Sequence, residues 1–234
     1  MKPGILAIDI GGTAIKAAVL DDTGTPLCER IRVPTPKPCP PDSLLDLLAD
    51  MARQLPTCDR VAVGFPGAVR EGRILTAANL GNAAWVDYPL EQAVGDRLGM
   101  PTHLLNDADM QGFALIEGVG LELVVTLGTG FGTALFRHGE LMPHLEIAHH
   151  PIRGDRTYDQ YLGNEALKRV GRKRWNQRLA YGLDMLYRML RPDRIVLAGG
   201  NARLVGLALP PYVTIMPDAA GISGGAALWR ADRR

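Results

Sequence analysis

Cysteine is scarce in this chain, and its three residues, Cys28, Cys39 and Cys58, do not form a CxxC spacing. A disulfide framework or a cysteine-built zinc cage is therefore not expected, and a reducing cytoplasm is the simplest compartment. Long apolar runs are also missing, since no stretch approaches the roughly 18 residues of a membrane-spanning helix. The apolar run at the N-terminus is interrupted at once by Asp9 and two glycines, unlike a signal peptide. We expect a cytoplasmic protein without a membrane partner.

An excess of charge of one sign is missing as well. The chain has 26 Lys and Arg against 25 Asp and Glu, for a net charge of +1. This balance argues against nucleic acid as a partner. The local exception is the basic cluster Lys168–Arg178, which has two interpretations: the rim of a groove for a polyphosphate donor, or a solvated helix face.

Strands and helices alternate through both halves of the sequence, which indicates an α/β fold. Short apolar runs predict strands at 5–10, 15–20, 28–33, 61–63, 102–105, 123–126, 133–136 and 194–198. Helical spacing predicts helices from a Ser43 cap to Leu55 and at 90–98, 108–117, 158–170, 173–190 and 221–229. A strand, a glycine turn and a second strand occur twice, at Asp9 and again at Thr126. We therefore expect two related domains, 1–105 and 106–234, with the last helix able to pack back on the first.

The first glycine turn, DIGGTAIK at residues 9–16, has the features of a phosphate-binding loop. Gly11-Gly12 would expose backbone N–H groups to an anion and let a phosphate approach closely. Thr13 adds a hydroxyl group, and Lys16 adds a cation. Asp9, at the end of the strand, is a candidate for holding Mg²⁺ through water. An ordinary hairpin turn fits the same residues.

The second glycine turn, LGTGFGT at residues 127–133, is denser in glycine and fits a cradle for nucleotide phosphates. It lacks the Walker A spacing GxxxxGK[ST] and the Rossmann spacing GxGxxG. Gly200-Asn201 follows a buried strand, where an adenine or ribose could approach the backbone; a simple turn at the start of a helix is the alternative. Two such turns together favour a phosphate clamp more than either one alone.

Asn106-Asp107 lies where a predicted strand ends. A carboxylate there could take the proton of a substrate hydroxyl, and phosphoryl transfer needs little else beyond positioning and charge neutralisation. Asn106 could hold a neighbouring hydroxyl. The alternative is that Asp107 only caps the next helix, and spacing alone favours that interpretation.

Glu146 and His149 stand three positions apart, on one side of a turn, and both could bond sugar hydroxyls. His144 and His150 lie nearby in the sequence. Four such side chains also permit a metal site, and a plain polar loop is the third interpretation. Spacing does not decide among the three.

Together these motifs resemble the ROK family of sugar kinases, within the hexokinase–actin–Hsp70 superfamily, over nearly the whole chain. The segments that carry the resemblance are DIGGTAIK (9–16), GFPGAV (64–69), ANLGNAAW (78–85), LNDAD (105–109), LGTGFGTAL (127–135) and EIAH (146–149). Their order and spacing are more specific than any one of them. The resemblance implies a ribonuclease-H-like (actin-like ATPase) fold of two α/β domains, with sugar and nucleotide in the cleft.

The resemblance also implies roles for individual residues. Asp107 would be the general base. The sugar would be held by Asn79, Asn106, Glu146 and His149, with Gly67 in the GxPG loop and Asp159 as a further candidate. The phosphoryl donor, ATP or polyphosphate with Mg²⁺, would be lined by Gly11, Gly12, Thr13, Gly128, Thr129, Gly130 and Gly200. A homodimer is expected on the same ground.

Two departures from the family pattern bear on function. The cluster CxCGxxGCxE, which binds structural zinc in many members, is absent, and Ala148 replaces the motif glycine before His149. The short, cysteine-poor architecture resembles the polyphosphate-glucokinase branch. We expect a phosphotransferase that acts on a hexose hydroxyl, with glucose as the first candidate. A non-catalytic sugar sensor, or a kinase of an amino sugar or another small alcohol, is the alternative.

Overall fold

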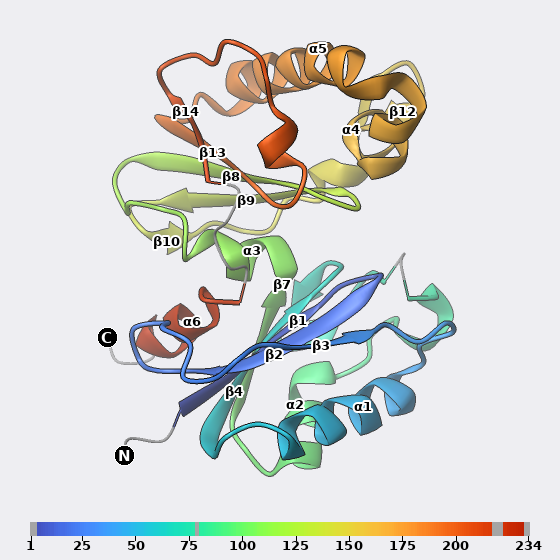
Figure 1. Cartoon of the computed structure of the whole chain (residues 1–234), viewed down its shortest axis with the longest axis vertical. Helices are drawn as coiled ribbons and strands as arrows, with labels where there is room; N and C mark the ends of the chain where they lie inside the picture. The colour runs from blue at the N-terminus through green and yellow to red at the C-terminus, as the bar shows by residue number, and fades with distance from the viewer. Residues whose placement is uncertain (1–3, 78–79, 217–221, 232–234) are drawn as a thin grey trace. The chain divides into compact units, whose positions relative to one another are not determined.

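The computed structural model describes residues 4–77, 80–216 and 222–231. The chain divides into two compact units, Met1–Ala114 with Ala220–Arg234, and Leu115–Ala219 (Figure 1). The division lies one short helix beyond the predicted boundary at 105/106, because the helix α3 (Asp107–Gly112) packs on strands of the first unit. The last helix, α6 (Gly225–Ala231), also belongs to the first unit.

A five-stranded mixed sheet forms the centre of the first unit, with the order β3-β2-β1-β4-β7. Its strands in that order are Ile31–Pro34, Ala14–Leu20, Gly4–Ile10, Cys58–Phe65 and Thr102–Asn106. β1, β2 and β3 form an antiparallel meander, while β4 runs parallel to both β1 and β7. The parallel strands β1, β4 and β7 therefore end at the same edge of the sheet, where ligands bind in α/β folds.

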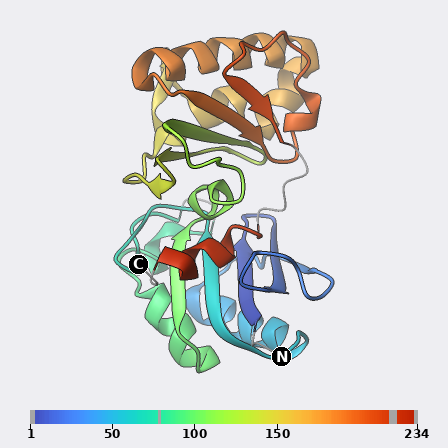
Figure 2. The ribbon, with the colours of Figure 1, turned by 90° about the vertical axis from the view of Figure 1, so that its left-hand side faces the viewer.

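Helices cover both faces of this sheet, because successive side chains of a strand point to opposite faces. Leu6 and Ile8 of β1 pack in the same core as α1 (Pro41–Arg53) and α2 (Leu90–Leu98). Ile5 and Ala7 pack instead with α6 and with Met110 of α3. Figure 2 looks onto the face that α6 covers. The smaller elements of the first unit follow β4 in the sequence: β5 (Val69–Arg70), β6 (Arg73–Ile74) and the 3₁₀ turn η1 (Asn82–Ala84).

The second unit has a five-stranded sheet of the same design, with the order β10-β9-β8-β13-β14. The strands in that order are Glu140–Leu141, Phe131–Arg137, Leu121–Leu127, Arg194–Ala198 and Val213–Ile215. Asp9 and Thr126 are each the last residue but one of the central strand of their sheets. The repeat predicted from the two glycine turns is thus seen as a repeat of sheet topology.

Two helices cover one face of the second sheet: α4 (Tyr158–Leu162) and α5 (Asn164–Leu190). Trp175 of α5 is fully buried among strand side chains, and its indole N–H donates to the Leu162 carbonyl at 2.7 Å. The smaller elements are β11 (Pro151–Arg153), β12 (Arg156–Thr157), and the 3₁₀ turns η2 (Ile147–His149) and η3 (Ala202–Leu204).

The predicted α/β class is confirmed, but several element ends differ. The Ser43 cap is wrong: α1 begins at Pro41, because proline's fixed φ suits the first helical turn. The helix predicted to run to Glu117 ends at Gly112, and the N–H groups of Glu117 and Gly118 bind the Glu122 carboxylate instead. No helix within the described ranges is both long and apolar enough to cross a membrane.

The long helical stretch after Thr157 breaks in two places. Gly163, in an extended conformation, separates α4 from α5, and this break was not predicted. Gly171, with φ of 74°, kinks α5 at the division predicted between residues 170 and 173.

Candidate active site

The first glycine turn joins β1 to β2 and is fixed from both sides. The Gly11 N–H donates to the Ala14 carbonyl at 3.1 Å. Thr35, a buried residue, donates its hydroxyl to the Gly11 carbonyl at 2.6 Å and its N–H to the Thr13 carbonyl at 3.1 Å. The N–H groups of Gly12 and Thr13 make no hydrogen bond within the described part of the chain. They are therefore available to an anion, as a phosphate loop requires.

Asp9 and Lys16 face each other across the β1–β2 pair. The Lys16 ammonium lies 2.8 Å from Asp9 Oδ2, and the Asp9 carboxylate is buried. Sequence reasoning gave these residues separate roles, in Mg²⁺ and phosphate binding, but the structure joins them in one ion pair. One carboxylate at a strand end fits Mg²⁺ that is held mostly by water and phosphate oxygens, which is the usual coordination of this ion.

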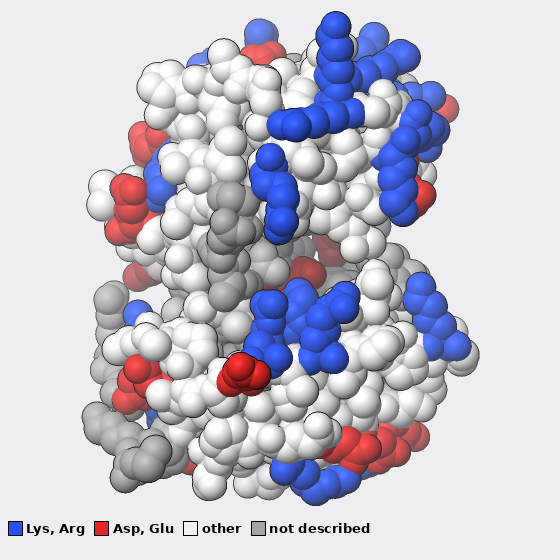
Figure 3. Space-filling view, in the orientation of Figure 1, with Lys and Arg blue, Asp and Glu red and all other residues white. Residues whose placement is uncertain are grey.

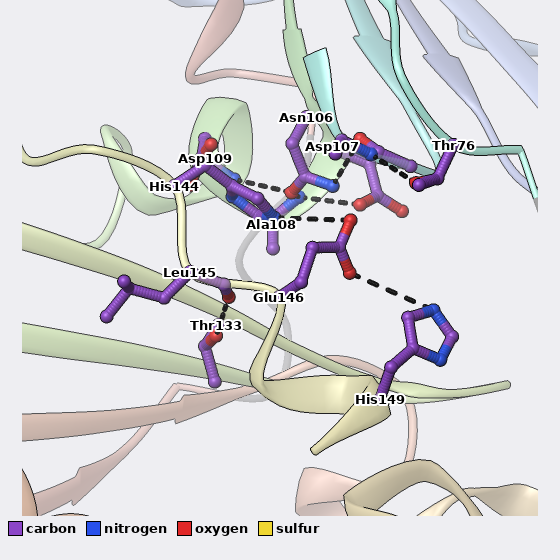
Figure 4. Close-up of polar contacts among 12 residues, drawn as sticks. Thr76, Asn106, Asp107, Ala108, Asp109, Thr133, His144, Leu145, Glu146 and His149 are labelled. Atoms are coloured by element: carbon purple, nitrogen blue, oxygen red, sulfur yellow. Dashed lines mark hydrogen bonds and ion pairs between the residues drawn. The ribbon is translucent and has the colours of Figure 1, made fainter. Parts of the chain in front are cut away.

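Asn106 caps helix α3 and ties it to the GxPG loop (Figure 4). Its side-chain oxygen accepts from the N–H groups of Ala108 and Asp109, at 2.8 and 3.3 Å. Its amide nitrogen donates to the Gly67 carbonyl at 3.0 Å. The structure thus brings Asn106 and Gly67 together, and both ends of the Asn106 amide already bind the protein.

Asp107 is the first residue of α3 rather than its cap, so the interpretation of Asp107 as the N-cap is wrong. Its carboxylate is half-buried, and Oδ1 accepts the N–H of Ala108 at 2.8 Å. Because α3 directly follows β7, Asp107 lies at the sheet edge where β1 and β4 also end. This edge also holds Asp9 and the first glycine turn.

Gly67 is required where it stands, because the chain passes very close to it. A Cβ at this position would lie 1.9 Å from the carbonyl oxygen of Thr76. The Thr76 hydroxyl in turn accepts the N–H of Ala68 at 2.9 Å. Asn79, the other predicted sugar contact of this region, lies outside the described residues.

The second glycine turn joins β8 to β9 and is held by two asparagines. Asn201 donates its N–H to the Leu127 carbonyl and its side-chain amide to the Gly128 carbonyl, at 2.9 and 3.1 Å. Asn164 donates its N–H to the Thr129 carbonyl at 3.1 Å. The N–H groups of Thr129 and Gly130 have no partner among the described residues. This turn therefore also presents amides to an anion, with Gly200-Asn201 at its side.

Asp159 braces the same turn from α4. Its Oδ1 accepts the N–H of Phe131 at 2.5 Å, and a Cβ on Gly130 would come within 2.7 Å of that oxygen. Burial raises the pKa of Asp159, although the Phe131 N–H and the nearby His149 oppose this rise, and Glu146 adds to it. The structure therefore places Asp159, proposed from sequence as a sugar contact, against the backbone of the glycine turn.

Glu146 and His149 lie together at the 3₁₀ turn η2 (Figure 4). The Glu146 carboxylate is 3.8 Å from a ring nitrogen of His149 and 3.8 Å from one of His144, which is too long for a hydrogen bond. Thr133 of β9 fixes the loop by donating its hydroxyl to the Leu145 carbonyl at 3.2 Å. Across the described ranges, no group of three or more His, Cys, Asp and Glu could hold a metal ion, so the metal interpretation of this loop has no ligand set.

Comparison with known proteins assigns the family. The sequence profile described as "ROK family" matches residues 5–149, which include both glycine turns, Asn106-Asp107 and the Glu146/His149 turn. This chain belongs to the ROK family. The ROK resemblance drawn from the motifs is thereby confirmed.

Several relatives match this ROK chain over most of its length. The polyphosphate glucokinase of Mycobacterium tuberculosis is 28% identical over 241 residues, which cover 96% of this chain and 91% of the relative. The crystal structure of an inorganic polyphosphate/ATP-glucomannokinase from Arthrobacter has a TM-score of 0.89 at 28% identity, covering 99% and 100% of the two chains. An N-acetylmannosamine kinase of Citrobacter koseri is 34% identical over 142 residues, or 58% of this chain and 49% of the relative. The predicted two-domain, ribonuclease-H-like fold is confirmed.

Sequence reasoning missed the residues that hold the two glycine turns in shape. Thr35 lies in a proline-rich segment, and Asn164 opens a long helix, so neither carries a motif. They reach the turns only because β3 pairs with β2 and because α5 starts beside the β8–β9 turn. No local signal could have identified them.

Proposed function

We propose that this sugar kinase transfers the terminal phosphoryl group of inorganic polyphosphate or ATP to a hydroxyl group of glucose, with Asp107 as the general base. The observation that supports Asp107 as the base is that Asn106 and Asp107 have different roles at the end of β7. Asn106 caps α3, so the carboxylate of Asp107 is not needed for that task. A half-buried carboxylate at the carboxyl edge of a parallel sheet is suited to accept a hydroxyl proton.

The proposed step needs little more from the protein than position and charge. The hydroxyl oxygen attacks the terminal phosphorus as its proton passes to Asp107, and the bond from that phosphorus to the rest of the donor breaks. The N–H groups of Gly12 and Thr13, and those of Thr129 and Gly130, are each suited to bind phosphate oxygens.

When Mg²⁺ is bound, it supplies positive charge to the phosphate oxygens. Asp9 is the residue that would hold one of its waters, and Lys16 would share the charge of that carboxylate. Gly200 and Asn201 would receive the nucleotide when ATP is the donor. Glu146 and His149 would bind sugar hydroxyls.

Polyphosphate, glucose and the kinase reaction are supported by the relatives that match nearly the whole chain. A second candidate, a kinase of an amino sugar, has its own support in the relative at 34% identity. A homodimer and a cytoplasmic location stay predictions. A matrix of donors and sugars tests these alternatives: polyphosphate and ATP, each with glucose, mannose and N-acetylmannosamine. Turnover confined to the amino sugar would replace glucose as the substrate.

The variant Asp107→Asn tests the base. Asparagine keeps an oxygen that can accept the Ala108 N–H, so the fold and glucose binding should be preserved. Loss of general-base catalysis should lower kcat roughly 10²–10⁴-fold. Asp96→Asn, at an exposed position of α2, is the control and should leave kcat unchanged. A kcat for Asp107→Asn close to that of the wild type would eliminate Asp107 as the base.

A further inference from the structure

Four arginines surround one cavity in the second unit, away from both glycine turns in the sequence. Arg153 and Arg156 come from the β11–β12 hairpin, and Arg174 and Arg178 lie four positions apart on α5. The cavity has a volume of about 400 Å³ and is also lined by Tyr161 and Tyr181. Figure 3 shows basic side chains gathered at the end of this unit where Figure 1 labels β12 and α4. We call these four residues the arginine site.

Arg178 is the buried member of the arginine site, with 7% of its surface exposed. One guanidinium nitrogen donates to the Tyr161 carbonyl at 3.2 Å, and the group stacks 4.6 Å from the centre of the Tyr161 ring. Within the described ranges, no carboxylate pairs with it. A buried charge without a counter-charge is costly, so this position calls for an anion.

The other three arginines are exposed, and they also have no carboxylate partner within the described ranges. Arg153 donates to the Tyr161 hydroxyl at 3.4 Å and lies 6.0 Å from the centre of the Tyr181 ring. Neither it nor Arg156 nor Arg174 forms an ion pair in the described part of the chain, although Asp155 lies in the turn of the same hairpin. Elsewhere on α5, by contrast, Lys168 pairs with Glu165 and Arg188 pairs with Asp184.

The pKa of Arg178 is lowered by its burial and by its positive neighbours. Burial lowers it most, Tyr161 opposes the shift, and the positive charges of Arg156, Arg174 and Arg169 lower it further. Arginine nevertheless stays protonated in proteins, so the repulsion remains until an anion offsets it. Several guanidinium groups around one cavity suit an anion with several phosphate groups, because the guanidinium fork matches phosphate oxygens.

Helix α4 connects the arginine site to the second glycine turn. Its residue Asp159 holds the Phe131 N–H of that turn, and its residue Tyr161 holds Arg178 and Arg153. The glycine turn and the arginine site are thus both held by residues of the same five-residue helix. An extended chain of phosphates is the kind of anion that could be bound by both.

We propose that the arginine site binds inorganic polyphosphate and holds the part of the chain that lies beyond the reacting phosphates. The choice of polyphosphate rests on the proposed function, whereas the inference of an anion site rests on buried Arg178 and the three exposed arginines around the same cavity. The site would favour long chains over short ones and would contribute little to the use of ATP, whose three phosphates end at the nucleoside.

The test uses the double variant Arg156→Gln/Arg174→Gln, because both side chains are exposed and the fold should tolerate their loss. The control is Lys168→Gln/Arg188→Gln, which removes the same charge from α5 where each cation already has a carboxylate partner. Binding of long-chain polyphosphate, pyrophosphate, glucose 6-phosphate and ATP is measured by calorimetry at several salt concentrations. The Michaelis constants for polyphosphate and ATP are measured beside it.

We expect the double variant to bind long-chain polyphosphate at least about tenfold more weakly than the control does, which is a loss of about 1.4 kcal/mol. Two lost phosphate contacts should also reduce the slope of log K against log salt by roughly 1.4, at about 0.7 per contact for a single-stranded polyanion. The Michaelis constant for polyphosphate should rise, while that for ATP should stay within about twofold.

Equal polyphosphate binding by the double variant and the control would overturn the proposal. So would equal competition by glucose 6-phosphate, which would mark a site for a small phosphorylated metabolite, or a change only in oligomeric state, which would mark an interface between copies. The proposed function fails separately: a protein that binds polyphosphate through these arginines but phosphorylates no sugar would refute the kinase assignment and keep the site. A kinase whose Michaelis constant for polyphosphate is the same in the double variant and in the control would refute the arginine site and keep the kinase assignment.

Discussion

Asn106 offers a sharp test of what the asparagine beside the proposed base does. Replacing it with alanine removes the cap of α3, which costs about 0.5–2 kcal/mol in comparable helices. It also removes the donor to the Gly67 carbonyl, which is half-buried, and an unsatisfied carbonyl there costs about 1–3 kcal/mol. The two effects together predict a loss of about 3 kcal/mol. For a chain of this size that corresponds to a decrease in Tm of about 6–12 °C.

Calorimetry and glucose kinetics on Asn106→Ala and Asn106→Ser separate the two possible roles of this residue. Serine can still cap the helix, so Asn106→Ser should recover the capping part of the loss and keep only the Gly67 part. We expect the Tm to fall in the order wild type, serine, alanine. A Tm within about 2 °C of the wild type for the alanine variant, together with a large rise in the Michaelis constant for glucose, would refute this reasoning. The amide would then act on the sugar instead of on the loop.

Two further predictions concern the close approaches beside the proposed site. Gly67→Ala forces a methyl group to within 1.9 Å of the Thr76 carbonyl oxygen, so it should destabilise the first unit by more than the roughly 1–3 kcal/mol of ordinary overpacking. The control is Gly206→Ala, where the nearest neighbour of the added methyl group is 3.4 Å away. This control should unfold at nearly the same denaturant concentration as the wild type. For Asp159, the folded-state pKa is raised above 3.8, so its contribution to stability is present below pH 3.8 and is lost as the pH rises through the folded-state pKa. Urea unfolding should therefore show Asp159→Asn gaining stability relative to the wild type as the pH rises across that window, and a relative loss would contradict the shift.

The central strands were predictable because they are apolar for most of their length. In β1, β2 and β8 nearly every residue is buried, so the sequence shows them as apolar runs with only isolated polar residues, such as Asp9, Lys16 and Glu122. The edge strands β10 and β14 are two and three residues long, which is too short for any pattern. Their strand character comes from pairing with β9 and β13, and no sequence window contains that partner.

The candidate site was predictable as a set of motifs but not as a set of partners. Residue types near a strand end indicated Asn106-Asp107, yet only the structure shows that asparagine takes the cap and aspartate begins the helix. Lys16 and Asp9 were each predicted to bind a ligand, and only the antiparallel register shows that they also form an ion pair with each other. Which side chain binds a given donor, acceptor or charge depends on the neighbours that compete for it in the folded structure. The order of residues along the sequence does not contain that information.

The basic cluster on α5 illustrates the same limit and explains why the arginine site separates from it. The sequence presents Lys168–Arg178 as one run, but the helix turns successive residues to different sides. Lys168 forms an ion pair with Glu165, one turn earlier on the helix. Arg174 and Arg178, four positions apart, share a face and meet the two arginines of the β11–β12 hairpin, where no carboxylate pairs with them in the described part of the chain. A net charge of +1 therefore conceals a local surplus of positive charge that folding creates. Burying Arg178 among other arginines lowers the stability of the fold, so stability alone does not explain its position.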